Sequence, residues 1–119
     1  MTVNKALGDA IKPIGYKIPE GKHTGAGTGS GVPYFTFDVT TYPSGHADDG
    51  PTYLRQLVTI HFHAPHGFDC TPVKIRTANR LHRAGFTWPS IIQIDEATGP
   101  HVVFESEFAE GVPDDADDN

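Results

Sequence analysis

The sequence contains a single cysteine, Cys70, among 119 residues. One cysteine forms no disulfide within the chain and cannot supply the several thiolates of a cysteine-based zinc site. Long apolar runs are also missing. No stretch approaches the roughly 20 apolar residues of a membrane span, and the N-terminus lacks the apolar core of a secretory signal. We therefore expect a protein without disulfides or membrane segments that is made in the cytoplasm.

A concentration of basic charge is absent as well. Nine Lys and Arg stand against 15 Asp and Glu, giving a formal net charge of −6. Nucleic-acid binding requires a dense basic surface facing the phosphates, so we expect no nucleic-acid recognition and no membrane partner. Many of the acidic residues fall in residues 110–119, EGVPDDADDN, which we predict to be a disordered acidic tail. Residues 1–109 are predicted to be one domain, because a chain of this length supports one core.

Two segments have the periodicity of amphipathic helices. Apolar residues recur at steps of three and four from residue 3 to residue 14, and again after residue 71. Thr71 is the expected N-cap of the second helix, and Pro72 its first helical residue. Ile75, Ala78, Leu81 and His82 are expected on one stripe of this helix, and Gly85 at its end.

Strands are predicted where apolar and polar residues alternate. The alternating segments are 33–43, 53–64, 90–95 and 101–108, with a polar turn between the first two and a hairpin around EATGP between the last two. Strands and helices do not alternate along the chain, so a parallel doubly wound sheet is not expected. We predict an α+β fold, with a mostly antiparallel sheet of about four strands and helices packed on one face.

The same alternation divides each strand into a core face and an outer face. The outer face contains more apolar residues than is usual for a sheet face that is fully exposed to solvent. We therefore expect this face to contact another protein, and a second copy of the chain is one candidate. The interface candidates are Tyr34, Tyr53, Arg55, Leu57, His61, His63, Val103, Glu105 and Glu107.

Histidines are the residues of this sequence that are best suited to bind a metal ion or to take part in catalysis. Three of the seven lie in HFHAPHG, where His61 and His63 project from the same face of a strand, as many pairs of metal ligands do. His66 is the candidate third ligand. The alternative is that the pair only continues the polar outer face of the strand. Because no general base or further ligand set follows at a recognisable spacing, we expect no metal, no cofactor and no catalytic residue.

Four segments follow one another in a recognisable order: VPYFTFDV, ADDGPTYLRQLVTIHFHAP, IRTANRLHRAGFTW and HVVFESEF. Over roughly residues 14–108, this order and spacing resemble the small tail terminator, or tail completion, proteins of long-tailed, siphovirus-like bacteriophages and prophages. The glycine-rich loop at 25–31 and HFHAPHG depart from the pattern of many relatives.

The resemblance implies a structural role in the virion and no enzymatic activity. Such a protein is one subunit of a six-fold ring that caps the tail tube, ends its polymerisation and offers the surface for head–tail joining. The implied partners are other copies of itself in a homo-hexameric ring, the major tail tube protein, and the head connector or neck proteins. The implied location is the tail–neck region of the virion, after assembly in the host cytoplasm. We expect loops 22–32 and 43–52 to project towards the tube or the connector.

Two alternatives stay open at this point. The first is a head-completion or neck protein, which differs from a tail terminator in the partner that it binds first. The second belongs to another class and is a small metal-dependent enzyme that uses His61, His63 and His66.

Overall fold

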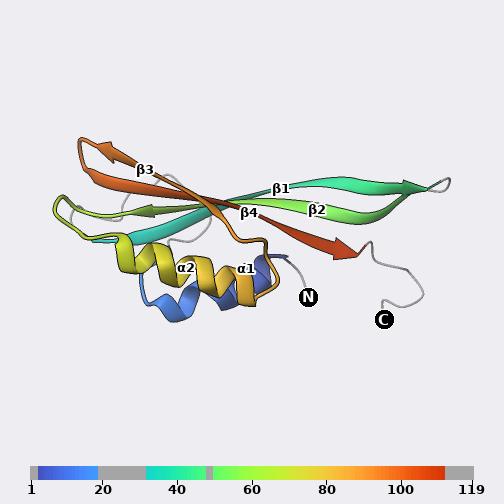
Figure 1. Ribbon diagram of the computed structural model, residues 1–119, viewed down its shortest axis with the longest axis horizontal. Helices are drawn as coiled ribbons and strands as arrows, with labels where there is room; N and C mark the ends of the chain where they lie inside the picture. The colour runs from blue at the N-terminus through green and yellow to red at the C-terminus, as the bar shows by residue number, and fades with distance from the viewer. Residues whose placement is uncertain (1–2, 19–31, 48–49, 112–119) are drawn as a thin grey trace.

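A computed structural model describes residues 3–18, 32–47 and 50–111 (Figure 1), and for residues 42–47, 50–54 and 109–111 it describes the backbone alone. Within these ranges the four strands form one antiparallel sheet in the order β1-β2-β4-β3. The predicted α+β fold is confirmed. The elements are α1 (Val3–Ile11), η1 (Lys12–Ile14), β1 (Tyr34–Ala47), β2 (Gly50–His63), α2 (Thr71–Arg83), β3 (Ser90–Glu96) and β4 (Gly99–Gly111).

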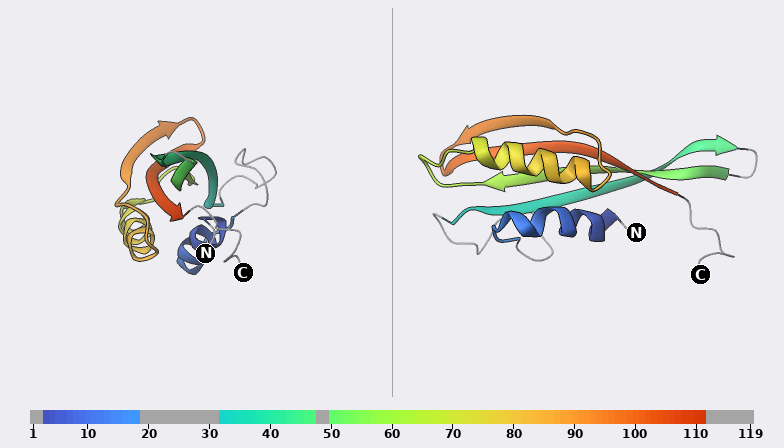
Figure 2. Two further views of the ribbon diagram at one scale, coloured as in Figure 1. Left: turned by 90° about the vertical axis from the view of Figure 1, so that its right-hand side faces the viewer. Right: turned by 60° about the horizontal axis from the view of Figure 1, so that its bottom comes forward.

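Both helices lie on the same face of the sheet, which leaves the opposite face without a helical layer (Figures 1 and 2). The core lies between the helices and the sheet and consists mainly of side chains that sequence alternation assigns to the core face. The fully buried members with the largest side chains are Leu7 and Ile11 of α1, Leu81 of α2, and Phe35, Ile60, Phe62 and Phe104 of the sheet. Within the described ranges, no helix is both long enough and apolar enough to cross a membrane.

Arg80 joins the two helices. Its Nε donates a hydrogen bond to the carbonyl oxygen of Ala10 over 2.9 Å, and its Nη2 donates to the carbonyl oxygen of Asp9 over 3.2 Å. The last carbonyls of a helix have no partner within the helix itself. The guanidinium therefore satisfies the end of α1 and holds it beside α2.

The predictions for the start and the buried stripe of α2 are wrong in detail. The N-cap is Cys70, and Thr71 is the first helical residue, with its N–H donating to Asp69 Oδ1 over 3.1 Å. Two of the four residues predicted for one stripe, Ile75 and His82, are exposed, Ile75 by 57%. Ile75 lies two residues from buried Val73, which places it about 200° around the helix axis. The buried stripe consists of Val73, Thr77, Ala78 and Leu81.

The hairpin of β1 and β2 is longer than the sequence pattern predicts. The polar segment 43–52, expected to be a projecting turn, instead continues the ladder, with Ser44 paired to Tyr53 and Ala47 to Gly50. Backbone hydrogen bonds form this ladder, and they do not require alternating apolar side chains. The two strands consequently extend past both helices as an arm, in a molecule 53 Å long (Figure 1). β4 accompanies this arm and pairs with β2 as far as Tyr53, which lies opposite Gly111.

Three predicted features fall partly or wholly beyond the described residues. β4 continues to Gly111, two residues past the predicted end of the domain at residue 109. The rest of the predicted acidic tail, residues 112–119, lies outside the described ranges, as do the glycine-rich loop at 25–31 and nearly all of the predicted loop at 22–32.

Candidate functional site

The sheet face opposite the helices, called here the outer face, brings the predicted interface candidates together. The register aligns Tyr34 with His63, His61 with Val103, and Leu57 with Glu107, so alternate residues of three strands share this face. Thr59 pairs with Glu105 and Arg55 with Ala109 in the same ladder. Tyr53 occupies the corresponding position on the β2 backbone, and its side chain lies outside the described set.

Two further apolar residues belong to this face and were not among the interface candidates. Ile92 pairs with Val103 and Ile94 with His101, which places both isoleucines on the outer face of the edge strand β3. Their exposures are 53% and 46%. The segment SIIQID predicts a strand but does not show which of its isoleucines faces the core. The structure assigns Ile91 to the core and leaves the other two exposed.

The histidines of the outer face converge at the end of the sheet near the β3–β4 turn. His63 lies directly opposite His101 in the ladder, and His61 is two residues along the same strand. One ring nitrogen from each of these three side chains lies within 4.8 Å of the other two. We call His61, His63 and His101 the histidine cluster.

The predicted third ligand, His66, does not join the pair. It is exposed in the turn after β2, where its Nε2 lies 2.6 Å from the carbonyl oxygen of Ala97. His101 takes its place in the cluster. Sequence reasoning missed His101 because HVVFESEF shows only that His101 begins a strand. The register of β2 against β4 is needed to place it beside His63.

A hydrogen-bonded series links the cluster to a carboxylate. Glu96 Oε2 lies 3.1 Å from His101 Nδ1, and His101 Nε2 lies 2.8 Å from His61 Nδ1. A carboxylate accepts hydrogen bonds, so His101 donates from Nδ1–H to Glu96. In a neutral His101 the Nε2 atom then accepts the proton of His61 Nδ1–H.

His63 has the most unusual environment of the three. Its ring stacks between Tyr34, at a centroid distance of 4.6 Å, and His101, at 4.2 Å. Its Nε2 is buried and has no hydrogen-bond partner among the described residues. Burial, followed by the proximity of His101 and His61, lowers the pKa of His63 to about 4, against the weaker opposing effect of Glu96. His63 is therefore neutral at pH 7.

An ion pair occupies the outer face further along β2 and β4. Arg55 Nη2 lies 2.8 Å from Glu107 Oε2, and Arg55 Nε lies 3.1 Å from Glu107 Oε1. The two contacts are the bidentate geometry that suits a guanidinium and a carboxylate. Both side chains are more than a third exposed, so the pair contributes little to stability and is available to a partner.

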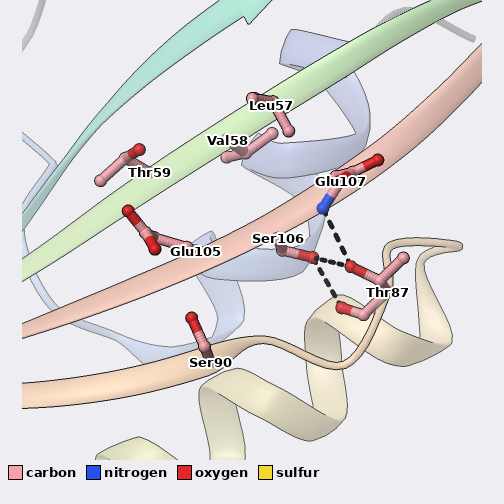
Figure 3. A pocket seen from close by; sticks show the side chains of 8 residues that line it. All are labelled: Leu57, Val58, Thr59, Thr87, Ser90, Glu105, Ser106 and Glu107. Carbon is pink, nitrogen blue, oxygen red and sulfur yellow. Dashed lines mark hydrogen bonds between the residues drawn. The ribbon is translucent and has the colours of Figure 1, made fainter.

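An open cavity of about 320 Å³ lies next to this pair, where β3 begins and the segment after α2 borders β4 (Figure 3). Thr87 holds the segment after α2 against β4. Its N–H donates to the Glu107 carbonyl, and Ser106 Oγ donates to the Thr87 carbonyl. The titratable residues that line the cavity are Glu105 and Glu107. No nucleophile paired with a base occurs among the described lining residues: Leu57, Val58, Thr59, Thr87, Ser90, Glu105, Ser106 and Glu107.

Cys70 is buried beneath the start of α2. A helix N-terminus stabilises a thiolate, but burial acts in the opposite direction and raises the pKa of the Cys70 thiol. The side chain therefore stays in the unreactive thiol form at neutral pH.

No model of a protein family matches this chain, and no curated protein sequence matches it.

Proposed function

We propose that this protein is a structural subunit of a bacteriophage tail. Copies of it form a ring that closes the end of the tail tube and presents the docking surface for the head. The observation that supports this proposal best is the partly apolar outer face, which the helices leave uncovered. Ile92 and Ile94 are about half exposed there beside Val103. Contiguous exposed apolar side chains of this kind mark protein–protein contact sites.

A ring of identical subunits requires two different contact surfaces on each copy. The outer face, with its isoleucines and the Arg55–Glu107 pair, is one. The arm formed by the far ends of β1 and β2 is the other, because it extends past the helices that cover one face of the sheet (Figure 1). β1 is also an edge strand, and an exposed strand edge pairs readily with a strand of another chain.

The order of elements supports the same proposal. Two long strands, a helix and a closing strand follow one another in the order that the resemblance to tail terminator proteins implies. A neck or head-completion protein is the nearest alternative, and it would bind the head connector before the tail tube.

The test uses the purified full-length chain and the major tail tube protein of the same phage. We expect electron microscopy to show rings on tube ends, and tubes that stop growing once the protein is added. Binding to the head connector in the absence of tubes would favour the neck alternative. Tubes that elongate unchanged, with no end-bound protein, would overturn the proposal.

Two variants distinguish a specific contact through the outer face from the general effect of adding charge to the protein surface. Ile92→Lys combined with Ile94→Lys places charge on the outer face, and we expect it to abolish capping in a chain that still folds. Ile75→Lys is the matched control, because Ile75 is equally exposed but lies on α2, on the other side of the sheet. We expect this control to cap tubes normally.

A further inference from the structure

We propose that the histidine cluster of His61, His63 and His101 binds a divalent transition-metal ion of the zinc class. The site lies at the end of the sheet where β2 meets β4. This inference goes beyond the role in tail assembly and does not depend on it.

The spacing of the ring nitrogens suits such an ion. In a tetrahedral zinc site with Zn–N bonds of about 2.0 to 2.1 Å, the ligand nitrogens are about 3.3 Å apart. His61 Nδ1 and His101 Nε2 are 2.8 Å apart, and all three ligand atoms lie within 4.8 Å of one another.

Glu96 supplies the partner that metal-binding histidines usually have. A ligating imidazole commonly donates its other N–H to a carboxylate, which fixes the tautomer and makes the ligand nitrogen more basic. The contact of 3.1 Å between Glu96 Oε2 and His101 Nδ1 is this arrangement, and it leaves Nε2 of His101 directed at His61.

The Nε2 atom of His63 has no hydrogen-bond partner among the described residues, and a bound metal ion would interact with it instead. A buried ring nitrogen without a hydrogen bond costs free energy, and coordination to a metal satisfies its lone pair.

The donor atoms select the class of metal. Imidazole nitrogens suit zinc, nickel and copper, whereas magnesium and calcium require oxygen ligands. Three protein ligands leave the fourth position of a tetrahedral ion to water or to a small anion.

The experiment uses the full-length protein without a polyhistidine tag, stripped of metal with a chelator. We expect titration calorimetry to show one equivalent of Zn²⁺ bound per chain, and the melting temperature to rise in its presence. His61→Ala, His63→Ala and His101→Ala should each weaken binding by about 100-fold or more, and Glu96→Gln by about 10- to 100-fold.

Two exposed histidines provide matched controls. His66→Ala and His82→Ala remove imidazoles outside the cluster, and we expect Zn²⁺ affinity to stay at the wild-type value. Circular dichroism verifies that each variant is folded, and His101→Gln, which keeps a polar side chain, replaces His101→Ala if that variant unfolds.

Two results would overturn the metal site. One is the absence of saturable Zn²⁺ binding to the wild-type chain. The other is a set of folded cluster variants that bind Zn²⁺ as tightly as the His66→Ala control. Tube capping by the metal-stripped protein is scored separately, so failure of the metal site and failure of the assembly role are distinguishable.

Discussion

His63 of β2 and His101 of β4 are direct cross-strand partners whose rings stack with centroids 4.2 Å apart. A proton on either ring opposes a proton on the other, because like charges at this distance repel. Together with the burial of His63, this proximity accounts for its lowered pKa.

The stability of the metal-free protein should fall as the pH decreases from about 6.5 to about 4. The pKa of His63 is about 4 in the folded chain and 6.5 as the model value for an unperturbed histidine. Between these values the unfolded chain binds more protons at this site, so acid favours unfolding. Tyr34, His61, His101 and Glu96 are the titratable groups around it. Urea unfolding followed by circular dichroism across this range should show a steeper loss for the wild type than for His63→Gln. Equal pH dependence of the two proteins would contradict the prediction.

Gly99→Ala should destabilise the protein by about 3 kcal/mol or more. Gly99 has φ +133°, a conformation that alanine strongly disfavours, and an added Cβ would lie 2.1 Å from the carbonyl oxygen of Ala64. That contact lies beside the histidine cluster, at the end of β2. The control is Gly8→Ala on α1, where an added Cβ meets nothing within 4 Å. We expect this control to raise the free energy of unfolding by about 0.5 to 1 kcal/mol. Equal effects in urea unfolding would argue against the close approach at Gly99.

Thr77→Val should stabilise the protein by about 1 kcal/mol. Thr77 is fully buried on α2, and its hydroxyl has no hydrogen-bond partner among the described residues. Valine has nearly the same shape and removes the unpaired hydroxyl. Thr77→Ser keeps the hydroxyl and removes the methyl group, so we expect it to be destabilising. A lower melting temperature for Thr77→Val than for the wild type would show that the hydroxyl has a favourable contact.

Local patterns predicted the elements because side-chain periodicity follows directly from backbone geometry. The alternation in VPYFTFDV separates buried Phe35 from half-buried Tyr34, and the turn at EATGP ends β3 at Glu96 before β4 begins at Gly99. The same patterns failed at the hairpin tip, where ladder hydrogen bonds continue without an apolar signal, and at Ile75, whose position depends on how the sheet orients α2.

The sequence by itself determined the fold class, the two faces of the sheet and the pairing of His61 with His63 on one of them. Each follows from residues close together in the chain. Only the tertiary structure decided that His101, and not His66, completes the cluster, and that Glu96 accepts a hydrogen bond from His101. Those positions depend on which strands are neighbours and on their offset. The offset is a property of backbone ladders between segments about 40 residues apart, and no local pattern specifies it.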